Sequence, residues 1–301
     1  CGAAVGVQVL TSTGVTIKDV NAKVNGREHA DGFTLQGSGG GSMVSSFFDV
    51  FTELSLDGGE IRQSPNTAIS GTRVTLRGGQ FGNGVMIRES PSSSVHNSTF
   101  DTEMVSLSLS SSIGVNVLSS TGVPIKGTTV KLRCPVCLGT GDSVGARLQG
   151  SGGSSVIDSF FDITYAWDLN NDGVQVFQSP DTTIRGTRVK ILGGKFGNAI
   201  WVRQSEGTQI LDSFFDVFTE MKATGIGAFD SPMVDLENNQ VTVTSTETAF
   251  GVRLVRSPDS ERVRGALYVV GGLSACGVQV LGSPGTAISQ VVGKVKSPGH
   301  A

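Results

Sequence analysis

Hydrophobic and polar residues alternate in short segments that recur along the chain at a nearly constant interval. Each repeat opens on a small residue, almost always glycine, and continues with an apolar–polar–apolar pattern. The openings fall at Gly6, Gly32, Gly58, Gly84, Gly114, Gly145, Gly173, Ala199, Gly225, Gly251 and Gly277. Successive openings are 26 residues apart except for longer repeats between residues 84 and 172. Such a period predicts a solenoid, in which each coil buries its apolar edge against the next.

Columns of like residues support this register. The fourth position of every repeat is apolar, and the seventeenth alternates in size through Phe48, Val74, Phe100, Val130, Phe161, Val189, Phe215 and Val241. Because inward side chains of stacked strands lie about 4.8 Å apart, such alternation fills a narrow core. Ser-Pro pairs and Gly-Gly pairs recur at fixed places and predict corners. We therefore predict an all-β fold, a right-handed parallel β-helix of about eleven coils with a 26-residue repeat.

A longer duplication is superimposed on the short repeat. The segment at 64–83 recurs in similar form at 179–198. We predict a single domain over residues 1–301 with internal block duplication of about 32–104 and 145–221. The pattern resembles the pectate-lyase-like right-handed parallel β-helix superfamily over nearly the whole chain. That resemblance implies architecture only, because the superfamily includes polysaccharide lyases and hydrolases, phage tailspikes, adhesins and structural surface proteins.

Composition and charge narrow the possible partners and location. The net charge is −3, and no basic run would follow a phosphate backbone, so we expect no nucleic-acid partner. No uninterrupted apolar run reaches 18 residues, so we expect no transmembrane segment. The first residue is Cys1, which suggests removal of a signal sequence and an extracellular or cell-surface location. Lipidation of Cys1 is one alternative.

Aspartates that precede the opening glycine are the candidate catalytic residues. Asp31 and Asp57 do so in successive coils and are predicted to stack as neighbours, which would suit an acid/base pair or a calcium site. The preferred interpretation is an Asx turn before glycine. The segment 170–173 resembles the Asn-Thr-Asp-Gly motif of polygalacturonases, which would make Asp172 an acid. The other motifs of that family are missing, so no catalytic residue is assigned beyond these three candidates.

Two arginines are candidate binding residues, whereas the histidines are not. Arg62 and Arg88 share one position in neighbouring coils and could hold an acidic sugar; the alternative is a solvated outer face with salt bridges. The three histidines, at positions 29, 96 and 300, show no metal-ligand spacing. We therefore expect no metal and no cofactor.

Four cysteines and the two ends of the repeat suggest covalent links. Cys134 and Cys137 are predicted to form a short-range disulfide, since no helix or second ligand pair supports a redox or zinc role. The segment GVQVL occurs in both the first and the last coil, and no capping helix is predicted. We infer head-to-tail association into a homopolymer, in which Cys1 and Cys276 would be disulfide candidates at the junction.

These observations favour a non-enzymatic extracellular structural protein that self-assembles through its coil ends into a sheath, surface layer or filament. Two alternatives stay open. One is a polysaccharide lyase or hydrolase that uses the aspartates, so enzymatic activity is left undecided. The other is a glycan-binding adhesin whose partner is a cell-surface polysaccharide.

Overall fold

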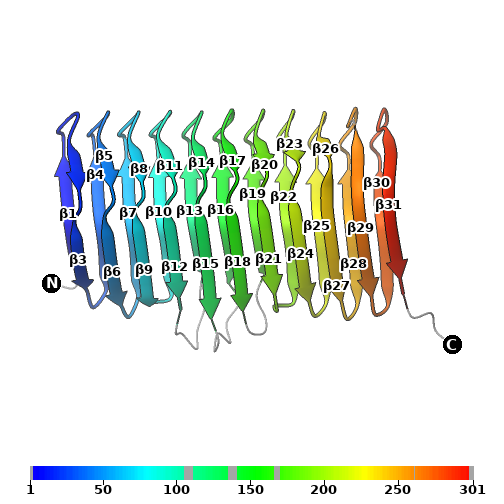
Figure 1. Cartoon of the computed structure of the whole chain (residues 1–301), viewed down its shortest axis with the longest axis horizontal. Helices are drawn as coiled ribbons and strands as arrows, with labels where there is room; N and C mark the ends of the chain where they lie inside the picture. The colour runs from blue at the N-terminus through cyan, green and yellow to red at the C-terminus, as the bar shows by residue number, and fades with distance from the viewer. Residues whose placement is uncertain (1–2, 105–110, 135–140, 166–169, 261, 298–301) are drawn as a thin grey trace.

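A computed structural model describes residues 3–104, 111–134, 141–165, 170–260 and 262–297. Within these ranges the chain forms 31 β-strands and no helix. The strands stack as successive coils along one axis, with the N-terminus at one end and the C-terminus at the other (Figure 1). The described residues contain no helix long or apolar enough to cross a membrane.

Three parallel sheets run the length of the stack. The first, here called the concave sheet, contains β1 (Ala3–Leu10), β4 (His29–Gln36), β7 (Ser55–Arg62), β10 (Phe81–Arg88), β13 (Ser111–Leu118), β16 (Asp142–Gln149), β19 (Asn170–Phe177), β22 (Phe196–Arg203), β25 (Lys222–Phe229), β28 (Thr248–Val255) and β30 (Ser274–Leu281). The second, the short sheet, contains β2 (Thr16–Lys18), β5 (Ser42–Val44), β8 (Ala68–Ser70), β11 (Ser94–His96), β14 (Pro124–Lys126), β17 (Ser155–Ile157), β20 (Thr183–Arg185), β23 (Gln209–Leu211) and β26 (Asp235–Glu237). The third, the outer sheet, contains β3 (Asn21–Asn25), β6 (Phe47–Thr52), β9 (Arg73–Gly78), β12 (Thr99–Glu103), β15 (Thr129–Cys134), β18 (Phe160–Tyr165), β21 (Arg188–Leu192), β24 (Phe214–Thr219), β27 (Asn239–Ser245), β29 (Val263–Gly271) and β31 (Ile288–Lys296).

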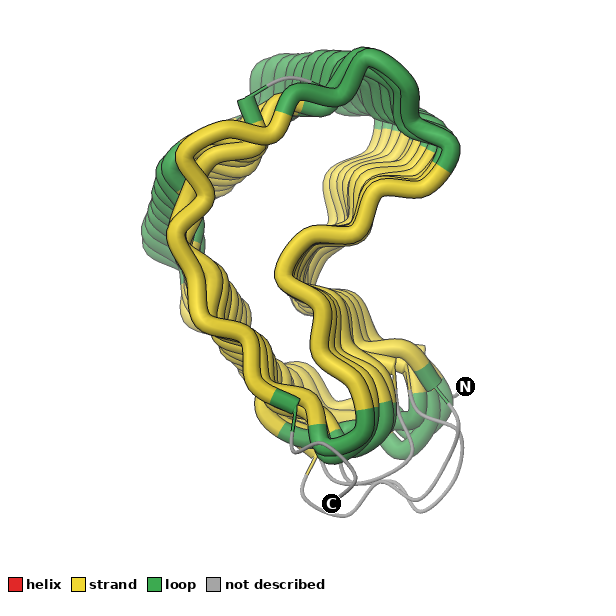
Figure 2. Tube along the Cα trace, turned by 90° about the vertical axis from the view of Figure 1, so that its right-hand side faces the viewer, coloured by secondary structure: helices red, strands yellow, loops and turns green. Residues whose placement is uncertain are grey.

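The predicted right-handed parallel β-helix is confirmed. In the view along the axis, each coil runs through the concave sheet, turns at a corner and returns through the short and outer sheets (Figure 2). Each strand pairs with its equivalent one coil later, as Asp31 of β4 does with Asp57 of β7. The register of the strands is therefore the register of the sequence repeat.

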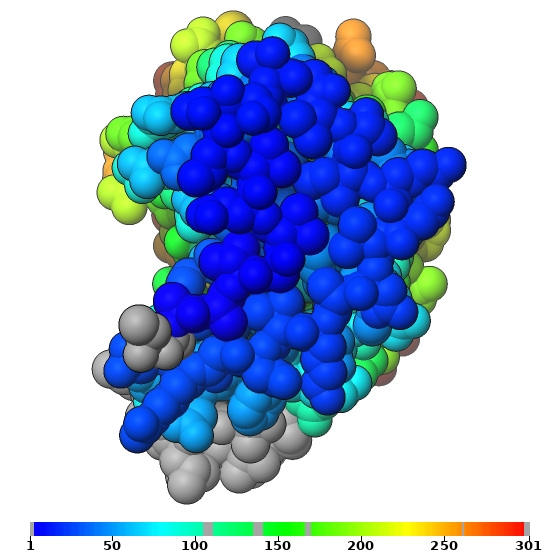
Figure 3. Space-filling view, turned by 90° about the vertical axis from the view of Figure 1, so that its left-hand side faces the viewer, coloured from blue at the N-terminus to red at the C-terminus, as the bar shows by residue number. Residues whose placement is uncertain are grey.

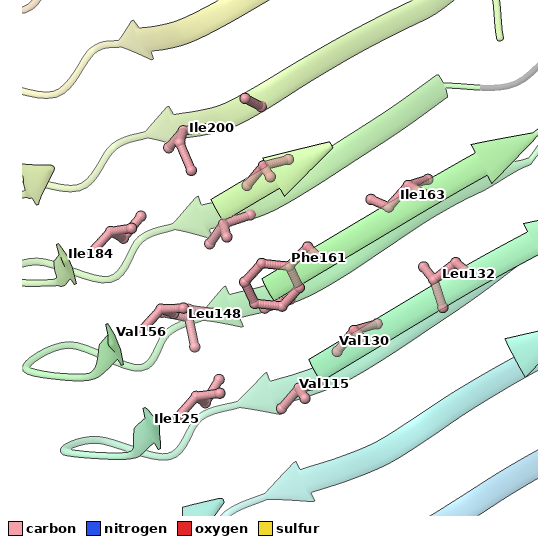
Figure 4. Close-up of a cluster of buried hydrophobic side chains, with 14 of the residues drawn as sticks. Val115, Ile125, Val130, Leu132, Leu148, Val156, Phe161, Ile163, Ile184 and Ile200 are labelled. Atoms are coloured by element: carbon pink, nitrogen blue, oxygen red, sulfur yellow. The ribbon is translucent and has the colours of Figure 1, made fainter. Parts of the chain in front are cut away.

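The core lies between the concave and outer sheets. The predicted alternating column is buried, from Phe48 at 0 % exposure to Val241 at 2 %. Figure 4 shows Val130 and Phe161 of adjacent outer-sheet strands pointing into the interior, where Val115 and Leu148 of the concave sheet also lie. Large and small side chains in successive coils fill this space, as expected for close-packed interiors.

The column of opening glycines lies directly against this core column. A Cβ added to Gly145 would lie 2.6 Å from Cδ1 of Phe161 and 2.5 Å from the carbonyl oxygen of Gly173. A Cβ on Gly84 would lie 2.8 Å from Cβ of Phe100. The concave sheet therefore bends inward at the glycines, as Figure 2 shows, and the outline of the space-filling view is notched on one side (Figure 3).

A ladder of serines holds the corner after the concave sheet. One buried serine per coil accepts a hydrogen bond from the backbone N–H of the serine one coil earlier, as Ser205 Oγ does from Ser179 N at 3.1 Å. The same hydroxyl donates to the carbonyl oxygen of Arg203 at 2.9 Å. The Ser-Pro pairs begin with serines of this ladder, so the predicted corner is confirmed and its buried backbone groups are paired.

Several predictions about the ends and the cysteines are not tested. The first strand begins at Ala3, slightly earlier than the predicted segment at 6–10. Cys276 has a free, half-buried thiol. Cys1 and Cys137 lie outside the described residues, so both predicted disulfides stay predictions. The same holds for head-to-tail association.

We predict that Gly145→Ala destabilises the fold by about 1–3 kcal/mol, because the new methyl group would overpack the contact with Phe161. Chemical denaturation monitored by circular dichroism measures this loss. Ala199, which occupies the same column, is the control: Ala199→Gly is expected to cost only about 0.5–1 kcal/mol, through backbone entropy. Wild-type stability of Gly145→Ala would show that the inward bend does not depend on glycine.

Candidate functional site

The inward bend turns the outer face of the concave sheet into a long depression, here called the concave groove. In each coil, the residues one position before and two positions after the opening glycine face this groove. Several of them are polar and almost fully buried, namely Asp31, Thr34, Asp57, Asn116, Asp172 and Gln175, each at most 9 % exposed. On a flat sheet such outward side chains would be solvated. The groove therefore desolvates polar groups without placing them in the apolar core.

A cleft of about 320 Å³ opens in the C-terminal half of the groove. It is lined by Asp142, Asn170, Asp172, Gln175, Phe196, Gly197, Asn198, Trp201 and Lys222. These residues come from four neighbouring strands of the concave sheet, β16, β19, β22 and β25. Parallel stacking places residues separated by one repeat side by side, so the cleft is assembled from distant sequence positions.

Asp172 forms the floor of this cleft. Gln175 Nε2 donates to Asp172 Oδ2 at 2.6 Å, and Asn198 Nδ2 donates to Asp172 Oδ1 at 2.8 Å. Burial raises the pKa of Asp172 above its ordinary value, although these two hydrogen bonds oppose the shift. This carboxyl group is therefore protonated more readily than a solvated aspartate, and its protonated form can both donate and accept hydrogen bonds.

Polar groups around Asp172 extend the network across three strands. Arg147 Nε donates to Gln175 Oε1 at 2.8 Å, and burial lowers the pKa of Arg147. At the cleft wall, Asn170 Nδ2 donates to Asp142 Oδ1 at 3.1 Å. The network positions amide, carboxyl and guanidinium groups around one cavity, an arrangement that suits a ligand with several hydroxyl groups.

An aromatic shelf continues the cleft toward the C-terminus. Trp201 and Phe229 stack with ring centroids 4.4 Å apart and planes 28° from parallel. Gly227 makes room for the Phe229 ring, because a Cβ there would lie 3.0 Å from its Cε2, whereas the 3.6 Å to Cε3 of Trp201 would be an ordinary contact. The Arg253 guanidinium lies over two rings, 5.4 Å from the centroid of Phe229 and 5.1 Å from that of Phe250. Aromatic faces beside hydrogen-bonding groups are suited to sugar rings, which have both apolar faces and polar edges.

Lys222 lies between the cleft and the shelf. It lines the cleft, and its Nζ is 5.7 Å from the ring centroid of Phe250. Burial, and then the charge of Arg253, lowers the pKa of Lys222. A cation that is partly stripped of water beside an aromatic ring binds anionic or strongly polar groups more tightly than a solvated lysine does.

The three predicted aspartates all face the groove, and the Asx-turn interpretation is wrong. Asp31, Asp57 and Asp172 lie inside β4, β7 and β19, not in turns. The Asp-Gly sequence marks the bend in the middle of a strand instead. Asp31 and Asp57 are neighbours in register, as predicted, whereas Asp172 belongs to the separate cleft.

His29, for which no metal-ligand role was predicted, lies beside the first two aspartates. His29 Nε2 lies 2.9 Å from Asp31 Oδ1, and ligand atoms of His29, Asp31 and Asp57 all lie within 4.8 Å of one another. Burial raises the pKa of Asp31 to about 6; His29 opposes the shift, and the charges of Asp57 and Glu60 add to it. These three side chains come from two paired strands, so the spacing of the histidines along the chain could not reveal the cluster.

The two predicted arginines are neighbours at the rim of the groove. Arg62 and Arg88 end β7 and β10 and pair in register. Arg88 Nε lies 3.3 Å from Glu89 Oε1, which fits the salt-bridge alternative, and neither arginine lines the Asp172 cleft. The residues that do form the cleft and shelf were missed, chiefly Gln175 and Trp201. Each lies two positions after the opening residue of its coil, Gly173 or Ala199, and a comparison of that position across the coils would have found both.

No protein-family model matches the chain, and no curated protein sequence shows significant similarity to it. Solved structures with similar coils include the Streptococcus pneumoniae surface protein and adhesin PfbA, at 10% identity, a TM-score of 0.39 and coverage of 96% of this chain and 91% of that one. Another is the Azotobacter vinelandii mannuronan C-5 epimerase AlgE6 A-module, at 12% identity, a TM-score of 0.38 and coverage of 94% and 91%. A third is the GH87 α-1,3-glucanase catalytic unit of Streptomyces thermodiastaticus, at 10% identity, a TM-score of 0.28 and coverage of 93% and 64%. These similarities concern the coil architecture and assign no activity.

The raised pKa of Asp172 predicts a pH-dependent stability. Below about pH 3.8, the ordinary aspartate value, the carboxyl is protonated in both folded and unfolded chains. As the pH rises, Asp172 ionises first in the unfolded chain. The free energy of unfolding that this group contributes therefore falls by up to about 1.4 kcal/mol per pH unit, until the pH passes its pKa in the folded chain. We expect Asp172→Asn to gain stability relative to wild type over that window.

Urea denaturation of both proteins from pH 4 to pH 8 measures this difference. Asp181→Asn, in an exposed turn outside the cleft, is the control and should follow the wild-type profile. A constant difference between Asp172→Asn and wild type at all pH values would contradict a raised pKa for Asp172.

Proposed function

We propose that this chain is an extracellular or cell-surface protein that binds a polysaccharide along its concave groove. A sugar ring would stack on Trp201, with its hydroxyl groups hydrogen-bonded to Asn170, Asp172 and Lys222 at the cleft. The observation that carries the proposal is the junction of the cleft with the aromatic shelf. A groove that continues over many coils also suits an extended polymer better than a compact ligand.

The chemistry of the cleft supports a carbohydrate more than a peptide or a nucleic acid. Its lining combines neutral amides, two aspartate side chains and one lysine, so it offers mixed donors and acceptors rather than a single charge. The stacked pair of Trp201 and Phe229 supplies a rigid apolar surface at low entropic cost. The net charge of −3 gives no general attraction for polyanions.

Trp201→Ala is expected to weaken polysaccharide binding about tenfold, a loss of about 1.4 kcal/mol. Affinity gel electrophoresis against alginate, pectate, laminarin, xylan and dextran would identify the ligand and measure the loss. Phe218→Ala is the matched control, because Phe218 is an exposed aromatic residue on the outer sheet. Two results would refute the groove as the binding surface. One is equal weakening by both substitutions; the other is unchanged migration of the wild-type protein in gels that contain any of the five polymers.

Cleavage of the bound glycan is a second candidate function, and the raised pKa of Asp172 favours it. A carboxyl with a raised pKa can act as a general acid toward a glycosidic oxygen, and Asp142 is a second carboxylate in the same cleft. Asp172→Asn should then abolish the release of new reducing ends or unsaturated products while binding persists. Binding without any product from the wild-type protein would leave the chain a binding protein.

Head-to-tail self-assembly into a sheath, surface layer or filament is proposed as a separate property. The identical segments 6–10 and 277–281 occupy equivalent places on β1 and β30, which supports a ladder that continues from one copy to the next. Sedimentation velocity with and without reductant should reveal multimers that grow with concentration. A monomer at all concentrations would refute this assembly.

A further inference from the structure

A histidine and two carboxylates meet in the N-terminal part of the concave groove. His29 and Asp31 lie two residues apart on β4, so both face the groove, and Asp57 is the register partner of Asp31 on β7. One ligand atom of each lies within 4.8 Å of the other two. Four strand steps separate β7 from β19, which places this cluster about 19 Å from Asp172. The inference below is therefore independent of the proposed glycan cleft.

The Asp31 carboxylate is buried and has few polar partners. The residue is only 8 % exposed. Its Oδ1 lies 2.9 Å from His29 Nε2, and this imidazole is its one close partner. The other oxygen accepts only a long bond of 3.5 Å from Thr34. A buried carboxylate with so few donors gains stability when a cation binds beside it.

The Asp57 carboxylate is held in place on one side. Asn83 donates to Asp57 Oδ1 from both its backbone nitrogen, at 3.1 Å, and its side-chain Nδ2, at 2.8 Å. Asn83 Oδ1 in turn accepts from Asn116 Nδ2 at 3.1 Å. This chain of amides orients Asp57 toward the cluster. Within the described ranges, no lysine or arginine forms an ion pair with Asp31 or Asp57, so their charge is opposed locally only by His29.

We infer that His29, Asp31 and Asp57 bind a divalent transition-metal ion, for which Zn²⁺ is the best-fitting probe. One imidazole nitrogen and two carboxylate oxygens form a mixed donor set that Zn²⁺ accepts, whereas Ca²⁺ requires six to eight oxygen ligands. Tetrahedral bonds of about 2.0–2.2 Å place ligand atoms about 3.3–3.6 Å apart. The separations in the cluster, from 2.9 Å to at most 4.8 Å, bracket that range.

The site is open on its groove side. Three protein ligands leave a fourth coordination position, which faces the concave groove and is available to water or to an oxygen of a bound molecule. The side chain of His29 is 40% exposed, so the metal would be reached from the groove without opening the coil. A metal at this place would neutralise the two stacked carboxylates and clamp β4 to β7.

Isothermal titration of the full chain with Zn²⁺ tests the site, with Ca²⁺ and Mg²⁺ as comparison ions. We expect one equivalent of Zn²⁺ to bind at this cluster, at least tenfold more tightly than either comparison ion. His29→Ala and Asp57→Asn should each weaken that binding tenfold or more. Titration with Co²⁺ gives a second readout, since a nitrogen and oxygen set of low coordination number produces visible absorption bands that His29→Ala should abolish.

Three matched variants separate this site from other sources of binding. His96→Ala removes an imidazole from the short sheet, Cys276→Ser removes the free thiol, and Asp172→Asn alters the other buried aspartate of the groove. All three should bind Zn²⁺ as the wild type does. The inference is overturned if no saturable binding occurs, if Ca²⁺ binds more tightly than Zn²⁺, or if Cys276→Ser rather than His29→Ala abolishes binding.

Loss of folding cannot imitate the expected result. His29→Ala is expected to unfold at a somewhat lower denaturant midpoint than wild type in the presence of a chelator, because Asp31 loses its contact with the imidazole. The variant should still fold, and the rise in midpoint that Zn²⁺ gives the wild type should be lost. A folded His29→Ala variant that still gains the full wild-type increase with Zn²⁺ would overturn the assignment.

Discussion

The contact between the glycine column and the alternating phenylalanine–valine column determines both the fold and the candidate sites. With no side chain at Gly145, the concave sheet can lie directly on Phe161 of the outer sheet. The inward bend that results partly buries the outer face of the concave sheet. Polar groups there are desolvated while they remain reachable from solvent, which is why burial shifts the pKa values of Arg147, Asp172 and Lys222. A flat solenoid built from the same side chains would present them as ordinary solvated residues.

The sequence repeat was sufficient to predict the architecture, because in a parallel β-helix the strand register equals the repeat period. It was not sufficient to predict the sites. Asp31 precedes a glycine and therefore has the local pattern of a turn; only the stacking of coils makes that glycine a bend within a strand. His29 acquires a role through a neighbouring strand that lies 26 residues away. The aromatic shelf depends on Gly227 leaving space for the Phe229 ring that stacks on Trp201. Low overall aromatic content was a poor guide, because composition does not show where the rings lie.

The two sites of the groove share one structural unit. Asp57 and Asp172 each precede the opening glycine of their coil, and each accepts a hydrogen bond from the asparagine one coil later, Asn83 and Asn198, at the same distance of 2.8 Å. This equivalence agrees with the predicted duplication of coil blocks, in which these coils correspond. An aspartate and an asparagine stacked in register satisfy each other, so the pair is a stable way to place a carboxyl in the groove. The pair fixes the position of the carboxyl but not its function.

The two proposed functions differ with the coil that precedes each pair. Before Asp57 the neighbouring strand supplies Asp31, a second carboxylate that the asparagine does not contact and that lies beside His29. Before Asp172 the corresponding position is Val144, which adds no charge. The residue three positions after each aspartate also loses its negative charge between the two sites. It is the acid Glu60 beside Asp57, and it is the amide Gln175, which hydrogen-bonds to the carboxyl, beside Asp172. A duplicated scaffold can therefore hold a metal-type site and a glycan-type site in one groove, because changes at a few outward positions leave the glycine and core columns intact.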